Sequence, residues 1–292
     1  MSGDCEALTN RHQVRHTERL RYAGIDIGGT WVRAAAFDER RRQLGRFRHH
    51  LGRSVADARV AFESVIGALC SPGAARRVDY GLCLPGIIDV GKRRLVRCVN
   101  APFLEGVDFD GWLRDAVAGC GSSVVAEHVL AEVLVDSEAA CRGAMSSLET
   151  ESASIVHLRF GTGVGLAWYR AGSFASLSRS SGCHVDLLRV PGSAVACSCG
   201  LVGCIEAHIH QADTELVLGQ AIGSVLSAIC SHCRPGVLIL GGGRFVHDMA
   251  FRRVLCRAAS ALQIPYIEDE LGDWAGACGA AFVAADGSGG RS

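Results

Sequence analysis

The sequence has no long hydrophobic run, no net charge and no leader-like N-terminus. None of its 292 residues belongs to an uninterrupted apolar stretch of about 18 residues, so no membrane-spanning segment is predicted. The 30 basic and 30 acidic residues cancel, which gives no bulk attraction to nucleic acid or to an anionic membrane. The first 21 residues are polar and charged, unlike a secretory signal. We therefore expect a cytoplasmic protein without nucleic-acid or membrane partners.

Two further absences narrow the class of protein. Fourteen cysteines among 292 residues fall below the roughly 8–10% that marks a disulfide scaffold, and we expect reduced thiols in a cytoplasm. The sequence contains neither a G-x-x-x-x-G-K-S/T loop nor a G-x-G-x-x-G fingerprint. The sequence therefore lacks the main motif of a P-loop fold and that of a dinucleotide-binding fold.

Glycine, in contrast, is abundant and clustered. There are 36 glycines, and clusters occur in DIGGT (26–30), GTGVG (161–165) and GGG (241–243). Glycine in a turn lets backbone N–H groups approach a phosphate closely, and successive N–H groups form an anion-binding nest. The third cluster suits a flat adenine and its ribose. An ordinary tight hairpin turn is the commoner explanation of either turn motif taken alone.

The predicted elements repeat with variation. Residues 22–47 predict strands around a glycine turn, and residues 154–174 predict the same arrangement again. Helices are predicted over 55–73 and 214–233 from their apolar periodicity. Further segments comprise a strand over 80–90 broken at Pro85-Gly86, a strand leading into a helix around Asp136, a buried strand over 235–243 and a C-terminal helix of small residues over 274–285. The repeat indicates two related α/β halves.

The segment CSCGLVGC places Cys197, Cys199 and Cys204 at C-x-C-x4-C spacing, thirteen residues after His184. Three sulfurs and one imidazole form the ligand set of a closed tetrahedral zinc site. The alternative is a group of buried, reduced cysteines. A second C-x-x-C at residues 230–233 has no partner pair nearby, and we expect it to end a helix.

The ordered motifs resemble those of the ROK family (repressor, open reading frame, kinase) of bacterial sugar kinases and sugar-responsive repressors. The resemblance runs from about Gly24 to Ala285 and rests on GIDIGGTWVRAAAF, LPGIID, NAPF, VDSEAACRG, GTGVG, GCHVDL, CSCGLVGCIE, VLILGGG and GACGAAFVA. It implies an α/β, two-domain actin-like ATPase (ribonuclease H-like) fold with an interdomain cleft for ATP and sugar. We expect a flexible extension over 1–21, a small N-terminal domain over 22–122 and a larger C-terminal domain with the zinc site over 123–292.

The resemblance also implies ATP, Mg²⁺ and a structural Zn²⁺ as cofactors. Asp136 matches the family's catalytic base for the sugar hydroxyl, although spacing alone favours an N-cap. Asp26 would organise water around a nucleotide-bound magnesium. The implied sugar-binding residues are Gly86, Asn100, Asp136, His184 and Glu206. The implied ATP-binding residues are Asp26, Gly28, Gly29, Thr30, Gly161, Thr162, Gly163, Gly165, Gly241, Gly242 and Gly243. The implied zinc ligands are His184, Cys197, Cys199 and Cys204.

Two positions depart from the family pattern. Val135 stands where an Asn usually precedes the catalytic Asp, and Ser181 stands where a second sugar-binding Glu is usual. A site that loses polar partners changes which sugar fits. The expected activity is phosphorylation of a hexose, at carbon 6 by analogy, with glucose or an altered hexose such as allose as substrate. A catalytically weak or inactive sugar sensor is the alternative.

The family's repressors carry an additional N-terminal helix-turn-helix domain. Only about 21 residues precede the first predicted strand, so we expect no DNA binding through such a module. The basic run over 38–50 contains an aromatic residue, but a solvated hairpin face explains it better than a nucleic-acid patch. We expect a homodimer or homotetramer.

Overall fold

A computed structural model describes residues 6–7, 19–70, 74–120, 127–148, 154–180 and 183–289. The chain divides into two compact units: unit 1 comprises Met1–Ser146 with Trp274–Ser292, and unit 2 comprises Ser147–Asp273. This division differs from the expected boundary after residue 122. The reason is that the strand before Asp136 joins the first sheet and the C-terminal helix packs on that same sheet.

Unit 1 contains a six-stranded sheet in the order β1-β4-β3-β2-β5-β8. The pairs β2–β3, β3–β4 and β1–β4 are antiparallel, whereas β2, β5 and β8 run parallel. The strands are β1 (Glu6–Ala7), β2 (Leu20–Ile27), β3 (Trp31–Phe37), β4 (Gln43–His50), β5 (Ala74–Leu84) and β8 (Glu127–Val135), and a separate pair is formed by β6 (Ile87–Asp89) and β7 (Arg94–Arg97). Most of the expected extension over 1–21 lies outside the described residues, but β1 pairs with β4.

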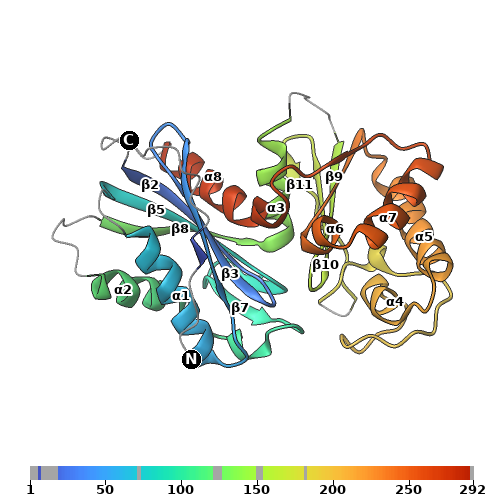
Figure 1. The fold of residues 1–292 in the computed structure, drawn as a ribbon, viewed down its shortest axis with the longest axis horizontal. Helices are drawn as coiled ribbons and strands as arrows, with labels where there is room; N and C mark the ends of the chain where they lie inside the picture. The colour runs from blue at the N-terminus through green and yellow to red at the C-terminus, as the bar shows by residue number, and fades with distance from the viewer. Residues whose placement is uncertain are drawn as a thin grey trace. The chain divides into compact units, whose positions relative to one another are not determined.

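Helices cover both faces of this sheet (Figure 1). They are α1 (Val55–Leu69), α2 (Phe109–Gly119), α3 (Asp136–Met145) and α8 (Ala275–Gly289), with a short 3-10 turn η1 (Pro102–Leu104). The buried residues of α1 recur at helical spacing, so they form one apolar face. One of them, Phe62, packs against the rings of Phe109 and Trp112 in α2. The hydroxyl of Ser54 caps the start of α1 by accepting from the Asp57 amide.

Glycines let α8 approach the sheet and α3 very closely. A Cβ added at Gly24 would lie 1.8 Å from the Ala277 carbonyl oxygen, and one at Gly279 would lie 1.8 Å from the Ala139 carbonyl oxygen. Real Cβ atoms do not approach backbone oxygens this closely, so only glycine fits at these crossings. The prediction of a closely packed C-terminal helix is confirmed.

Unit 2 contains a five-stranded sheet in the order β11-β10-β9-β12-β13. The predicted hairpin around the second glycine turn is confirmed as β9 (Ser154–Phe160) and β10 (Val164–Arg170), and β12 (Val237–Gly241) runs parallel to β9. The remaining elements are β11 (Ser173–Phe174), η2 (Asp186–Leu188), α4 (Ile205–Gln211), α5 (Glu215–Cys233), α6 (Gly243–His247), α7 (Met249–Ala261), β13 (Tyr266–Glu268) and η3 (Gly272–Trp274).

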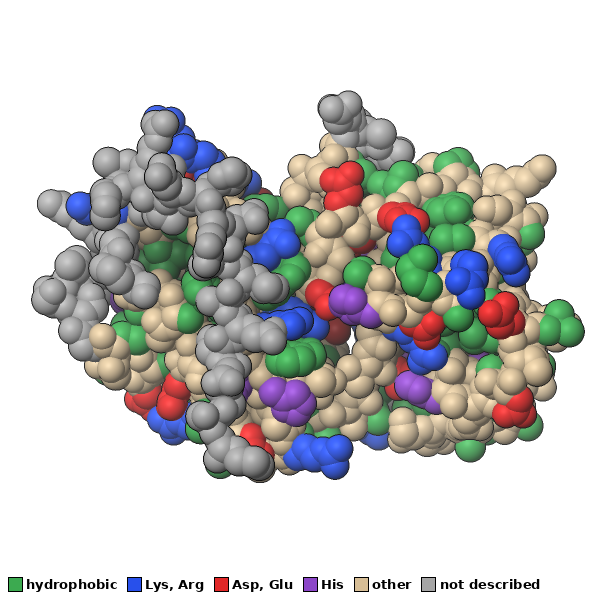
Figure 2. All heavy atoms as spheres, in the orientation of Figure 1, with side chains coloured by type: hydrophobic (Ala, Val, Ile, Leu, Met, Phe, Trp, Pro, Cys, Tyr) green, Lys and Arg blue, Asp and Glu red, His purple; other side chains and the backbone are tan. Residues whose placement is uncertain are grey.

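Helix α5 confirms the helix predicted over 214–233 and ends at the second C-x-x-C as expected. It is the one helix among the described residues that could span a membrane by length and composition. Core helices of soluble proteins can have the same length and composition. The buried side chains of α5, such as Ile222 and Leu226, belong to the core of unit 2. Acidic and basic side chains are interspersed over this unit on the face shown in Figure 2.

Candidate functional site

In unit 1, most of the predicted ATP- and sugar-binding residues lie at the carboxyl edge of three parallel strands. Asp26 of β2 lies beside Cys83 of β5, and Leu84 of β5 lies beside Val135 of β8. The segments that leave these strands therefore meet at one edge. They are the first glycine turn, Pro85-Gly86 and Asp136. Ligands of open α/β sheets bind at such carboxyl edges.

Asp26 is 1% exposed. Its Oδ1 accepts a hydrogen bond from the Cys83 thiol at 3.3 Å, and Nη1 of Arg33 lies 3.9 Å from Oδ2. Helix α8 closes the other side, since a Cβ at Gly276 would lie 2.9 Å from the same Oδ2. A buried carboxylate is costly unless polar or charged neighbours compensate it. The thiol donor and the guanidinium supply that compensation here.

The first glycine turn is closed by a hydrogen bond from the Gly28 amide to the Trp31 carbonyl at 2.9 Å. Gly28 does not have left-handed backbone, and an added Cβ would make only an ordinary contact, 3.5 Å from the Trp31 oxygen. The turn itself therefore does not require glycine at this position.

The two predicted sugar-binding residues Gly86 and Asn100 lie in different surroundings. Gly86 has φ of +87°, and a Cβ there would lie 2.2 Å from the Arg97 carbonyl oxygen, so local geometry alone demands glycine. Asn100 is exposed in the segment between β7 and η1.

Asp136 is the first residue of α3 and is partly buried. Its Oδ1 accepts a hydrogen bond from the Ser137 amide at 2.7 Å, which fixes the orientation of the carboxylate. The N-cap is Val135, whose side chain makes no capping hydrogen bond. The alternative explanation of Asp136 as the N-cap is therefore not supported by the structure.

In unit 2, the second and third glycine clusters also meet at one sheet edge. Residues 161–163 leave β9, and Gly242 and Gly243 leave the neighbouring parallel strand β12. The Gly161 amide donates to the Gly163 carbonyl at 2.9 Å, and a Cβ at Gly161 would meet no atom closer than 3.9 Å. Gly242 has φ of +94°, and its Cβ would lie 2.3 Å from the Phe160 carbonyl oxygen, so packing requires that glycine.

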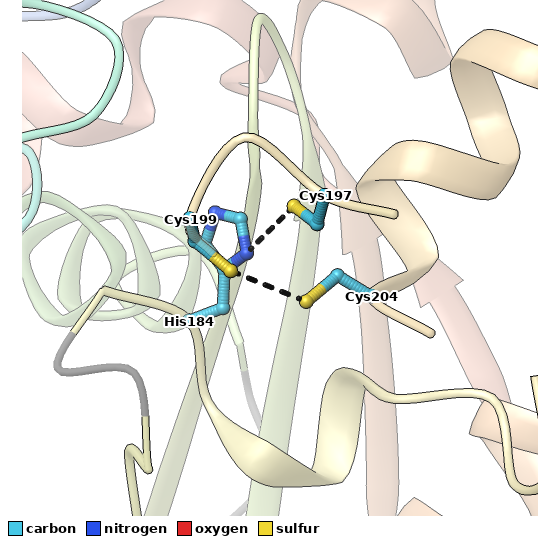
Figure 3. A group of neighbouring side chains, drawn as sticks. All are labelled: His184, Cys197, Cys199 and Cys204. Carbon is cyan, nitrogen blue, oxygen red and sulfur yellow. Dashed lines mark hydrogen bonds between the residues drawn. The ribbon is translucent and has the colours of Figure 1, made fainter. Parts of the chain in front are cut away.

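The four predicted metal ligands converge in unit 2 (Figure 3). Their ligand atoms all lie within 4.8 Å of one another. The Cys197 sulfur is 3.7 Å from Nδ1 of His184, and the sulfurs of Cys199 and Cys204 are 3.6 Å apart. Zinc bonds of about 2.3 Å to sulfur and 2.0 Å to nitrogen give tetrahedral edges of roughly 3.5–3.8 Å. The donor set and these two separations therefore fit Zn²⁺.

Backbone hydrogen bonds shape the loop that carries the three cysteines. The Cys197 amide donates to the Leu201 carbonyl at 2.9 Å, and the Gly200 amide donates back to the Cys197 carbonyl at 3.0 Å. Gly200 and Gly203 have φ of +90° and +79°, which explains the two glycines of the motif. Burial, followed by contacts with the other two thiols, raises the pKa of the Cys204 thiol above its ordinary value.

Glu206, in the first turn of α4, is 7% exposed. Its Oε2 lies 3.5 Å from Nε2 of His184 and accepts a hydrogen bond from the Val164 amide at 3.1 Å. The second ring nitrogen of His184 thus faces a carboxylate, as in many zinc-binding histidines. Within the described residues no second group of His, Cys, Asp and Glu side chains meets the spacing of a metal site.

Sequence reasoning missed two contacts of these sites, namely Cys83 with Asp26 and Val164 with Glu206. Each pair is more than 40 residues apart and has no local pattern that would reveal it. The substituted position Ser181 lies outside the described residues.

The two mixed sheets, each with a hairpin around a glycine turn and parallel strands beside it, define an α/β protein with the actin-like ATPase fold. A crystal structure of a ROK family glucokinase from Streptomyces griseus, in complex with glucose and AMPPNP, matches with a TM-score of 0.71 at 18% identity, covering 91% of this chain and 99% of that one.

The chain belongs to the ROK family, whose model matches residues 22–216. The N-acetyl-D-glucosamine kinase of Vibrio cholerae is 24% identical over 313 residues, which cover 90% of this chain and 99% of that protein. A ROK family transcriptional regulator, a homologue of the E. coli MLC protein, shares the fold with a TM-score of 0.57 at 12% identity, covering 97% and 85% of the two chains.

Proposed function

We propose that this protein is a cytoplasmic, ATP-dependent hexose kinase that transfers the γ-phosphoryl group to the 6-hydroxyl of its sugar. The observation that carries the proposal is the position of Asp136. It begins α3 at the same carboxyl edge at which Asp26 ends β2 and Gly86 follows β5. Phosphoryl transfer requires positioning, charge stabilisation and a carboxylate that accepts the hydroxyl proton. Membership of the ROK family supports this class of reaction.

Asp136 is the base in this proposal. The Ser137 amide holds its Oδ1, and the carboxylate takes the proton as the sugar oxygen bonds to phosphorus and ADP leaves. Asp26 would orient water around a nucleotide-bound Mg²⁺, which neutralises charge on the phosphates when bound. The sugar would contact Gly86, Asn100 and Glu206.

The two glycine turns would bind the ATP phosphates through backbone amides, with help from Thr30 and Thr162. Gly28 and Gly161 support this role because neither the backbone conformation nor the packing requires glycine there. Close approach of an anion is a remaining reason for glycine at such a turn. Residues 241–243 would face the adenine, although packing alone already accounts for Gly242.

His184, Cys197, Cys199 and Cys204 would hold a structural Zn²⁺, because four protein ligands leave no open position for water. The metal would fix the loop that leads into α4 and so present Glu206 to the sugar. Elemental analysis should find one zinc per chain, and Cys199→Ser should lose it. A Cys230→Ser variant, at the end of α5, should keep it.

The identity of the hexose depends on Val135, which places an isopropyl group where the family pattern has an amide. We propose glucose or an altered hexose such as allose, and N-acetylhexosamines are worth testing because of the Vibrio cholerae relative. A homodimer or homotetramer is the proposed assembly.

The test is ADP release from MgATP across a panel of hexoses and N-acetylhexosamines. We expect turnover with one sugar, lowered by roughly a hundredfold or more in Asp136→Asn because the base is lost. Asp115→Asn, which changes an exposed carboxylate, serves as the matched control. If folded, zinc-loaded protein turns over none of these sugars, the kinase proposal is wrong.

A sugar sensor without turnover is the second candidate. Val135 favours it, since the change removes a polar contact from the sugar pocket, and the regulator with the same fold shows that the ROK family includes regulators. Calorimetric sugar binding without ADP release would support the sensor.

A further inference from the structure

Glu206 makes a contact that sugar binding does not explain. Its Oε2 accepts a hydrogen bond from the amide of Val164, the residue that ends the second glycine turn and begins β10. Val164 and Glu206 are 42 residues apart in the sequence, and this hydrogen bond joins the turn to the start of α4, which directly follows the loop of the three cysteines. Both belong to unit 2.

The same oxygen lies 3.5 Å from Nε2 of His184. One atom therefore bridges the backbone of the turn and the imidazole of the metal-ligand cluster. The side chain of Glu206 is only 9% exposed, so water does little to replace either contact if the carboxylate moves away.

The amide of Val164 lies in the turn whose backbone amides would bind phosphate. The Gly161 amide is tied to the Gly163 carbonyl at the other end of the same turn, and the tip, Gly161 and Thr162, is exposed. Val164 pairs with Phe160 in the hairpin, and the hydrogen bond to Glu206 adds a second contact at the exit of the turn. Fixing a binding loop in advance improves affinity because less conformational freedom is lost on binding.

We infer that Glu206 is a positioning residue for the nucleotide, in addition to any contact it makes with sugar. It anchors the phosphate-binding turn to the zinc-ligand loop and so raises the affinity for MgADP or MgATP even when no sugar is present. The inference rests on the proposed function for the role of the turn, whereas the anchoring itself is a property of unit 2 alone.

Two substitutions separate anchoring from sugar binding. Glu206→Gln keeps a carbonyl oxygen that can accept from the Val164 amide, and Glu206→Ala removes the acceptor. Glu215→Ala changes an exposed glutamate in the first turn of α5 and is the matched control. Zinc content and circular dichroism establish that each variant is folded.

The first measurement is hydrogen exchange at the Val164 amide without ligand, followed by NMR. We expect at least tenfold faster exchange in Glu206→Ala, near-normal exchange in Glu206→Gln and no change in Glu215→Ala. Unchanged exchange in a folded Glu206→Ala protein would overturn the anchoring.

The second measurement is the dissociation constant of MgADP without sugar, by calorimetry. We expect a five- to tenfold increase in Glu206→Ala and a change within twofold in Glu206→Gln, while both variants bind the sugar more weakly. Equal MgADP binding by Glu206→Ala and the unmodified protein would overturn the inference. If the unmodified protein binds no MgADP, both the proposed function and the inferred role of Glu206 in nucleotide binding are wrong. The exchange experiment then still shows whether Glu206 anchors the turn.

Discussion

At the scale of single residues, the surroundings of Asp26 show how this fold accommodates a buried carboxylate. The thiol of Cys83 donates to Oδ1, and a guanidinium lies near Oδ2, inside a pocket closed by α8. Cys83 itself is 0% exposed, so no solvent molecule can take its place without a rearrangement. The thiol thus helps to keep the carboxylate oriented for its proposed role towards Mg²⁺.

We expect Cys83→Ala to raise the Mg²⁺ concentration needed for half-maximal activity several-fold, because Asp26 loses a donor. Cys83→Ser keeps a hydroxyl donor and should restore most of the Mg²⁺ dependence. Cys141→Ala removes another fully buried thiol, in α3, and controls for lost packing. The measurement is a magnesium titration of the initial rate. Identical titration curves for Cys83→Ala and Cys141→Ala would contradict the positioning role.

His128 of β8 predicts a pH dependence of stability. Burial lowers the pKa of His128, and its Nδ1 lies 2.9 Å from the hydroxyl of Tyr80. A histidine with a lowered pKa in the folded state binds fewer protons there than in the unfolded chain. The free energy of unfolding should therefore fall as pH drops below about 6.5, the unfolded value. Burial also lowers the pKa of His208, so that residue adds to the same decline.

Urea denaturation at pH 7.5 and pH 5.5 measures this effect. We expect a lower free energy of unfolding at pH 5.5, with a smaller loss in His128→Gln because one of the two contributing histidines is absent. The exposed His210 provides the control variant, His210→Gln, which should keep the full loss. A His128→Gln loss as large as that of the unmodified protein would rule out His128 as a cause.

At the scale of elements, close packing of helices α3 and α8 depends on missing side chains. An added Cβ at Gly279 would lie 1.8 Å from the Ala139 carbonyl oxygen, and one at Gly143 would lie 2.2 Å from the Ala275 carbonyl oxygen. Both clashes involve backbone, which cannot rotate away as a flexible side chain could. Whole helices would have to move to admit either methyl group.

Gly279→Ala should therefore destabilise the protein by about 3 kcal/mol or more, at the upper end of overpacking effects. The matched control is Gly223→Ala in α5, where an added Cβ meets no atom within 4 Å. That change should stabilise by about 0.5–1 kcal/mol, since alanine favours a helix over glycine. Thermal and urea unfolding measure both. Similar stabilities of the two variants would show that α3 and α8 pack less closely than described.

Local patterns predicted those elements whose partners lie nearby in the sequence. The hairpin of β9 and β10 follows from a glycine turn between apolar strands, and α5 follows from its apolar periodicity. The metal-ligand cluster was also predicted, since three of its four ligands lie within eight residues. The amphipathic helices α2 and α7 were not identified, although their apolar spacing was a usable signal.

Contacts across long sequence distances could not be predicted in this way. The return of α8 to unit 1 depends on glycines of β2 and β5 that face it, and a single sequence does not reveal which partner such glycines meet. The bridge from Glu206 to Val164 depends on how one loop folds back on another. Resemblance to the ROK family supplied roles for residues, but it did not supply these contacts.

At the scale of the whole molecule, the chain builds unit 1, then unit 2, and then returns to unit 1 with its last helix. Helix α8 packs on β2, β5, β8 and α3, and it closes the pocket of Asp26 through Gly276. Unit 1 is therefore incomplete until helix α8 is present. The carboxyl edge of its sheet, where the proposed base Asp136 lies, therefore depends on α8, which is more than 100 residues further along the sequence.

Ending the chain after Asp273 should consequently prevent unit 1 from folding cooperatively. Removal of α8 exposes the apolar face formed by β2 and β5, so we expect binding of the dye ANS and loss of a sharp thermal transition for unit 1. A peptide of residues 274–292 added in trans should reduce the dye binding, because it can occupy the same face. Deletion of residues 287–292 alone leaves the glycine contacts of α8 in place and should behave like the full chain. A truncated protein with an unchanged transition and no dye binding would mean that α8 is dispensable for unit 1.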